Sequence, residues 1–205
     1  QLLPVGEHVE LEKSDFLTSG FRYYHNSLDN NVFSSKGFMV DLNGKLILAD
    51  FDSQTNMSFF SNVDMKYSYS IGNDAFPLAI NTRAFLGLSF GDNLPAEYRY
   101  YVGGNENMFT GMNIVNYPGL SLMRRSADNT FILTESLQYN LLKFNYLSLS
   151  AGLAAFDMNF THFDFNDSFD AFVGLSYGIK LNPFPIEISL SRSLLNDEYT
   201  FLFNV

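Results

Sequence analysis

Strict alternation between apolar and polar side chains is the feature of this sequence that most limits its fold. From Phe59 to Ile71, apolar residues such as Met65 share one parity, whereas Asp64 and Lys66 fall on the other. Successive side chains of a β-strand point to opposite faces, so this period predicts a strand with one apolar face and one polar, even charged, face.

The same pattern predicts nine long strands, near residues 16–26, 37–50, 57–71, 77–91, 130–144, 146–157, 170–182, 185–194 and 198–205. Most are about 10–15 residues long, whereas strands in soluble proteins average roughly 5–6 residues and a tilted membrane-spanning strand needs about 9–11. No apolar run approaches the ~18 residues that a membrane helix needs. The sequence therefore predicts an all-β fold, an antiparallel transmembrane β-barrel.

The composition agrees with this fold and excludes other classes. Of the 205 residues, 46% are apolar and only 17% are charged, against about a quarter in soluble proteins. The net charge of −10 argues against nucleic acid as a partner, because phosphate binding needs a basic surface. The absence of cysteine excludes disulfides and thiolate metal sites. We expect outer-membrane lipid as the partner, with other outer-membrane protein subunits as a further option, and no cofactor.

The predicted connections alternate in length, as they do in outer-membrane barrels with short periplasmic turns and long outer loops. The short ones are 72–76, 144–145 and 182–184, and the long ones are 51–56, 92–129 and 157–169. The connection 195–197 is an exception, because it is short where a long loop is expected. Nine is an odd number, and an open edge in lipid leaves backbone groups unpaired. We therefore expect a lead-in segment at 1–14, a barrel portion at 15–205, and further strands beyond both ends.

Two segments resemble the Omp85 superfamily of outer-membrane barrels. Residues 27–37 are similar to the family's D-N-x-x-F-P-x-x-G turn and supply Asp29, Asn30, Phe33 and Gly37, with Ser34 in the usual proline position. Residues 94–104 are similar to the lead into the family's long sixth loop and supply Tyr98, Arg99, Tyr101, Gly103 and Gly104.

One departure from the family concerns this long loop. The loop usually carries an Arg-Gly pair that docks inside the barrel, whereas the matching place here reads Phe109-Thr110-Gly111-Met112. Arg124 and Arg125 follow later in the same loop and are candidates to replace the missing arginine. The departure argues against protein-insertase activity.

Both motifs look closest to the barrel attached to patatin-like phospholipases of Bacteroidetes. That resemblance implies that the nine strands are the last nine or so of about sixteen. It also implies an anchor for an N-terminal hydrolase domain outside this chain, with export of that domain left open, and no enzyme activity in the chain itself. Two alternatives stay open: an Omp85-type insertase, translocator or pore, and an accessory barrel subunit of a larger outer-membrane complex.

Motifs for chemistry are weak. The nucleophile pattern G-x-S-x-G occurs at 87–91 and 174–178, but both matches lie in predicted strands with no helix after them. A nucleophile elbow needs that helix, so we interpret these residues as small side chains of a barrel wall. Residues 164–170 resemble the start of a calcium loop but lack its sixth-position glycine and twelfth-position glutamate. We predict no catalytic, cofactor or metal site.

The remaining candidates lie at the polar positions of the alternating strands, and we expect them to face the lumen: Asp64, Lys66, Asn81, Arg83, Ser89, Lys180 and Glu187. We favour cross-strand pairing that fills a narrow interior, with a lined pathway as the alternative. Glu135 belongs with these charges by its chemistry, yet it shares parity with Leu133 and Leu137. A β-bulge would turn it inward.

Overall fold

A computed structural model describes residues 15–51, 54–71, 77–91, 99–104, 113–142, 144–157, 169–181, 185–194, 197 and 199–204. Its strands are β1 (Asp15–Asn26), β2 (Gly37–Phe51), β3 (Gln54–Ser70), β4 (Leu78–Phe90), β5 (Tyr100–Val102), β6 (Ile114–Val115), β7 (Arg125–Ala127), β8 (Thr130–Leu142), β9 (Asn145–Phe156), β10 (Phe169–Ile179), β11 (Ile186–Ser193) and β12 (Tyr199–Asn204). The nine long strands correspond to the nine predicted from alternation. Within the described ranges, no helix is long and apolar enough to cross a membrane.

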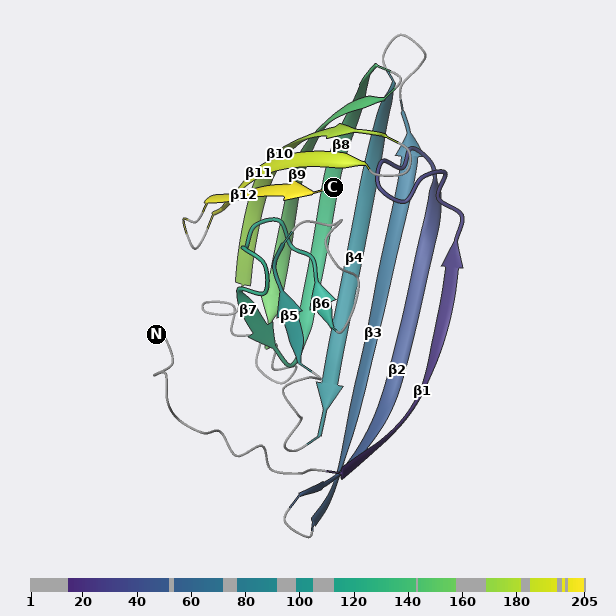
Figure 1. Cartoon of the computed structure of the whole chain (residues 1–205), viewed down its shortest axis with the longest axis vertical. Coiled ribbons are helices and arrows are strands. Elements are labelled where there is room, and N and C mark those ends of the chain that lie inside the picture. Colours follow the sequence, from purple (N-terminus) through teal and green to yellow (C-terminus); the bar gives the residue numbers. More distant parts are fainter. Residues whose placement is uncertain are drawn as a thin grey trace.

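The nine long strands form one antiparallel sheet in the order β1-β2-β3-β4-β8-β9-β10-β11-β12. Strand neighbours in sequence are neighbours in space, except that β4 pairs with β8 across the long loop. Figure 1 shows this sheet strongly curved, with β10, β11 and β12 bent over its upper part, and we call its concave side the hollow. Within the described residues β1 and β12 are the two edges and do not pair with each other, so the all-β prediction is confirmed while the sheet itself stays open.

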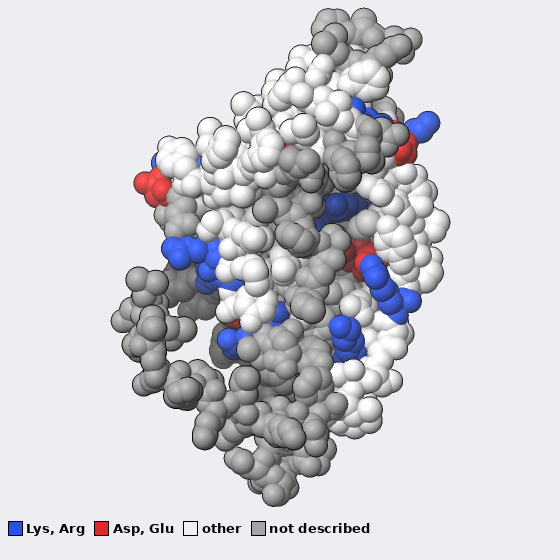
Figure 2. Space-filling view, in the orientation of Figure 1, with Lys and Arg blue, Asp and Glu red and all other residues white. Residues whose placement is uncertain are grey.

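Alternation sorts the side chains onto the two faces of the sheet. On β4, Arg83 and Phe85 point into the hollow and are buried, whereas Ile80 is exposed on the outer face. The pairing register carries this parity from strand to strand, since Leu86 lies opposite both Val63 and Phe131. Figure 2 shows charged side chains inside the curve of the sheet and a largely uncharged margin along β1 and β2.

The loop between β4 and β8 folds back into the hollow, as the resemblance to the family's long sixth loop leads us to expect. It contains a small sheet in which β5 pairs with β6 in parallel and with β7 in antiparallel orientation. Figure 1 shows these three strands inside the hollow, in front of β8 and β9. We call the described residues of this connection, 99–104 and 113–129, the inner loop.

The prediction of a long outer loop at residues 51–56 is wrong. β2 continues to Phe51 and β3 begins at Gln54, so the two strands form an extended hairpin. The polar sequence of this segment made it resemble a loop.

The bulge expected at Glu135 is also absent. Glu135 lies opposite Thr82 on β4 and Ala151 on β9 in uninterrupted register. The irregularity of β8 lies further on, between Asn140 and Leu142. Glu135 is therefore exposed on the outer face, because period-2 geometry fixes its side regardless of its charge.

Candidate functional site in the hollow

Arg83 ties the wall of the sheet to the inner loop. Its Nε and Nη2 donate to both carboxylate oxygens of Asp64 on β3, at 3.0 and 2.9 Å. Its Nη1 donates to the backbone carbonyl of Asn116 in the inner loop, at 3.1 Å. Arg83 is only 7% exposed, and a charge so far removed from water depends on such acceptors. One side chain therefore holds two strands and the loop together.

A second arginine balances the charge on the neighbouring strands. Asp41 on β2 lies directly opposite Asp64 on β3, an arrangement in which two carboxylates repel each other. Arg22 on β1 donates to both oxygens of Asp41, at 2.9 and 2.7 Å. Each carboxylate thus has its own bidentate arginine partner, and the four side chains form a row of zero net charge across β1 to β4.

Tyr100 on β5 anchors the start of the inner loop. Its ring is fully buried, stacks on Phe60 at 4.6 Å between centroids and meets Phe85 edge-on at 5.7 Å. Its hydroxyl donates to the backbone carbonyl of Ser61 at 2.5 Å. The ring lies over Gly87 of β4, where a Cβ would come within 2.5 Å of it. The absence of a side chain at Gly87 therefore leaves the space that the Tyr100 ring occupies.

Tyr117 anchors the returning half of the inner loop on the opposite side of the hollow. It is fully buried and meets Phe172 of β10 edge-on at 4.9 Å. Next to it, the hydroxyl of Ser191 on β11 donates to the backbone carbonyl of Pro118. Together with Tyr100, these contacts fix the inner loop to both sides of the curved sheet.

The glycine pair Gly103-Gly104 lets the two halves of the inner loop approach each other. Both residues have positive φ, at 134° and 88°. The Gly103 amide donates to the carbonyl of Val115 and the Gly104 amide to that of Leu120. A Cβ on Gly103 would come within 2.0 Å of the Ser121 carbonyl oxygen. Only glycine fits this position.

The connection between β1 and β2, residues 27–36, also enters the hollow, and we call it the inward turn. The Asp29 carboxylate accepts hydrogen bonds from the amide and hydroxyl of Ser35, at 2.8 and 2.5 Å, and from the Lys36 amide at 3.2 Å. Asn30 Oδ1 accepts from the amides of Val32 and Phe33. These short polar side chains shape the turn by replacing ladder hydrogen bonds.

Gly37 closes the inward turn. Its φ is +109°, and a Cβ there would lie 2.2 Å from the carbonyl oxygen of Ser27. The Ser27 amide in turn donates to the carbonyl of Phe38 at 2.8 Å. The glycine of the turn motif is thus required by the close approach of two backbone segments.

Phe33 carries the inward turn across the hollow to the late strands. Its buried ring stacks on Tyr146 of β9 at 4.6 Å, with only 6° between the ring planes. It also covers Gly178 of β10, where a Cβ would approach within 2.2 Å of the ring. Ser34 adds a 2.6 Å contact between its hydroxyl and that of Ser68 on β3. The turn therefore bridges strands that are far apart in the sheet.

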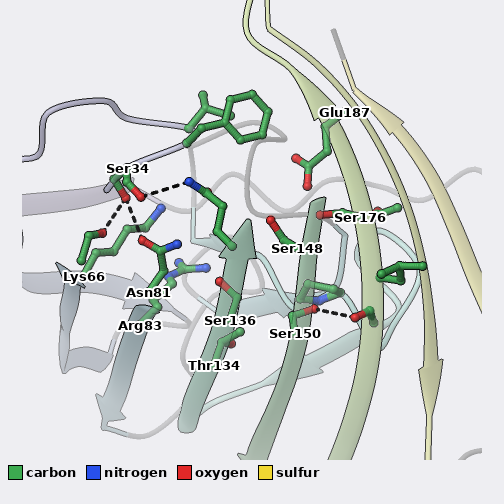
Figure 3. A pocket seen from close by; sticks show the side chains of 18 of the residues that line it. Ser34, Lys66, Asn81, Arg83, Thr134, Ser136, Ser148, Ser150, Ser176 and Glu187 are labelled. Carbon is green, nitrogen blue, oxygen red and sulfur yellow. Dashed lines mark hydrogen bonds between the residues drawn. The ribbon is translucent and has the colours of Figure 1, made fainter. Parts of the chain in front are cut away.

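A polar cavity lies between the inward turn and the inner loop (Figure 3). Ser34 of the inward turn and Pro118 of the inner loop both line it. Its charged lining comes from Lys66, Arg83 and Glu187, and hydroxyls of β8 to β11 supply much of the rest: Thr134, Ser136, Ser148, Ser150, Ser176, Ser189 and Ser191. The two inserted segments thus enclose a small, hydroxyl-rich space, to whose lining apolar residues such as Val32 and Leu175 also contribute.

Comparison with known families agrees with this arrangement. The profile of the OMP85 superfamily matches residues 4–205. The chain belongs to the OMP85 superfamily. Among curated proteins, none matches. Proteins of the superfamily are outer-membrane β-barrels, which supports a bacterial outer-membrane location for this chain.

In this OMP85 chain the long-loop residues have separate roles. Arg99 pairs with Asp128 at 2.8 Å, and the Arg125 guanidinium lies over the ring of Phe156 at 4.4 Å. Tyr101 belongs to β5, and Arg124 is exposed at a turn. Tyr98 and the segment 109–112 with Gly111 lie outside the described residues. Within the described part, a wall arginine, Arg83, binds the loop backbone.

The residues expected to face the lumen lie in four different surroundings. Asp64 and Arg83 form the ion pair, and Lys66, Asn81 and Glu187 line the cavity. Ser89 is buried beneath the inner loop, with its amide bonded to Asn129 Oδ1 at 2.8 Å. Lys180 follows β10 and lines a second pocket that includes Asp29 and Tyr146. The structure thus gathers most of them around the two inserted segments.

The two G-x-S-x-G matches lie in strands, and the calcium-like segment is described only in part. Ser89 on β4 and Ser176 on β10, the serines of the two G-x-S-x-G matches, lie within strands and on the hollow face. Residues 164–168 of the calcium-like segment lie outside the described part of the chain. Asp170 is described, and it accepts a 2.7 Å hydrogen bond from the hydroxyl of Ser193.

Sequence reasoning missed the aromatic anchors of the inner loop. Tyr100 and Tyr117 lie in a segment without periodicity, so no local pattern marks them as buried. A weaker signal exists in the wall itself: Gly87 and Gly178 replace larger side chains at inward positions, and each lies beneath an aromatic ring. Inward glycines within strands therefore mark places where another segment approaches closely.

Proposed function

We propose that this chain is a membrane-anchoring wall of an OMP85 barrel that keeps its own lumen closed. The apolar outer face is in contact with outer-membrane lipid, and the inner loop and the inward turn fill the lumen. The observation that carries this proposal is the attachment of the inner loop at Arg83, Tyr100, Tyr117 and Ser191, on both sides of the hollow. A loop fixed at so many points favours a closed anchor over an open pore.

The anchored cargo, in this proposal, is a patatin-like hydrolase domain encoded beside this segment. The support is the resemblance of the turn motif, whose Asp29, Asn30, Phe33 and Gly37 each have a defined contact. Export of the hydrolase would require the inner loop to leave the hollow. We therefore favour anchoring over export.

The closed lumen is tested by single-channel recording of the full-length protein in planar bilayers. Wild-type protein should give no stable conductance above that of the lipid, and deletion of residues 113–120 should produce discrete open channels. Deletion of the exposed residues Leu122 and Met123 is the matched control and should leave the conductance closed. A wild-type protein that conducts steadily would contradict the proposal and favour a pore.

The identity of the cargo is tested by reading the encoded sequence that adjoins this segment and by assaying phospholipid hydrolysis in outer-membrane fractions. A patatin module with hydrolase activity in that fraction supports the anchor. Repeated periplasmic modules and no hydrolase would favour an insertase or translocator.

A further inference from the structure

Glu135 occupies an exceptional position on the outer face of the sheet. It lies near the middle of β8, exposed, with Leu133 and Leu137 on the same face of its own strand. Its register partners are Thr82 on β4 and Ala151 on β9. The continuous register excludes a local turn of the strand, so the carboxylate points away from the hollow.

Charge is otherwise confined to strand ends on this face. Among outward-facing strand residues whose side chains the structure describes, the other charged one is Arg192, near the end of β11. Arg192 bonds to Asp197 in the adjoining connection at 2.5 Å. Glu135 therefore stands apart, as a carboxylate at mid-strand in an apolar wall.

The described sheet supplies only part of the hydrogen bonding that the Glu135 carboxylate can accept. The Thr82 hydroxyl donates to Oε2 at 2.9 Å, and this is the hydrogen bond that the described residues provide to the Glu135 side chain. A carboxylate at the depth of lipid tails is costly without a charged partner, and such residues in membrane proteins mark functional contacts. The described sheet provides no basic partner for the Glu135 carboxylate.

We infer that the outer surface around Glu135, Thr82 and Ala151 docks a second membrane-embedded protein that presents a lysine or arginine to Glu135. Charge complementarity selects a basic group. The ammonium groups of lipids lie at the membrane surface and do not reach mid-strand depth. A two-fold contact with a second copy at this point would bring two carboxylates together.

The inference rests on the proposed lipid contact of the outer face, and the reporter positions are chosen to separate the two. These 205 residues contain no cysteine, so A151C beside Glu135 and L190C on β11 each introduce one thiol into this segment, and any cysteine elsewhere in the full-length protein is replaced by serine. Leu190 is 52% exposed on the same outer face, far from Glu135 in the strand order. The full-length protein in native outer membranes is labelled with a small apolar maleimide.

We expect A151C to react at least tenfold more slowly than L190C in native membranes, and at a similar rate after detergent extraction. Combining A151C with Glu135→Leu or with Glu135→Gln should remove the protection, because both variants remove the charge. Equal rates in the wild-type background, or protection that persists in either variant, would overturn the inference. Oxidative formation of an A151C homodimer would overturn it in favour of a second copy.

The lipid contact has its own readout in the same experiment. If L190C reacts with a charged, water-soluble maleimide in native membranes, the outer face is not in lipid and the proposed function fails. If L190C reacts with the apolar reagent alone while A151C is unprotected, the lipid contact stands and the docking inference fails.

Discussion

Arg83 shows at the residue scale how a single side chain can join wall and loop. A planar guanidinium offers several donors in fixed directions, so it can hold a carboxylate with two hydrogen bonds and still reach a third acceptor. Arg83 does this with Asp64 and the carbonyl of Asn116. A lysine at this position would provide a point charge but not the fork.

Replacing Arg83 by methionine should lower the free energy of unfolding by about 3 kcal/mol, because Asp64 would keep its charge without a partner. The measurement is urea unfolding of the protein from lipid vesicles. The double variant Arg83→Met/Asp64→Leu should recover part of the loss. If the double variant is no more stable than the single one, the ion pair is not the cause.

Asp29 is the residue of the inward turn whose charge matters most. Burial on its own would raise the pKa of Asp29, but hydrogen bonds from Ser35 and Lys36 outweigh it and hold that pKa below the ordinary value. A lowered pKa stabilises the folded state above the unfolded-state pKa of about 3.9, and this contribution is lost as the pH falls through the folded value.

We therefore expect Asp29→Asn to destabilise the protein by about 1 kcal/mol at pH 7, where the wild-type carboxylate is ionised and partly exposed to solvent. The difference between the two proteins should shrink towards pH 3. Unfolding in vesicles at both pH values measures it, and a difference that stays constant with pH would exclude the carboxylate charge as its origin.

At the scale of elements, the inner loop depends on packing against wall aromatics more than on its own short sheet. β5, β6 and β7 contain only two or three residues each, too few for independent stability. Tyr100 supplies the buried contact, through Phe60 and Phe85. The inner loop therefore depends on packing against β3 and β4 for its ordered structure.

Tyr100→Ala should release the inner loop while leaving the wall folded, with a local cost of about 3–5 kcal/mol for the lost aromatic packing. Limited proteolysis should then cut within residues 113–129 of the inner loop, whereas the same residues of the wild-type protein should resist cleavage. Tyr101→Ala, at a neighbouring half-exposed position, is the control and should leave the loop protected. Cleavage that is equal in both variants would contradict the role of Tyr100.

At the scale of the whole molecule, the two faces of the wall meet different surroundings, and adjacent residues can test this. Leu42 lies on the outer face and Asn43 on the hollow face of β2, at the same depth. Leu42→Arg should lower the free energy of unfolding in bilayers by about 2–4 kcal/mol, the cost of a cation at the bilayer midplane. Asn43→Arg should cost clearly less. Equal costs would contradict the assignment of the faces.

The strands and the sides of their residues could be predicted from the sequence because a period of two is a local signal. Glu135 illustrates the strength of this signal, because the alternation places it on the outer face of the sheet although it is charged. The fold of the inner loop could not be predicted, because Tyr100 and Tyr117 are buried by strands distant in sequence. The turn motif indicated that residues 27–37 have a special shape, but not that Phe33 lies against Tyr146 and Gly178.

The reach of the inward turn has a consequence for the order of assembly. Gln138 on β8 donates to the backbone carbonyl of Ser34 across 104 residues of sequence, and Phe33 has no ring to stack on before β9 arrives. A hairpin made early in synthesis therefore stays unfinished until much later strands take their places. The inward turn completes these contacts only when the sheet has curved far enough to bring β8 and β9 to it, and a chain that stops before β9 leaves Phe33 without its stacking partner.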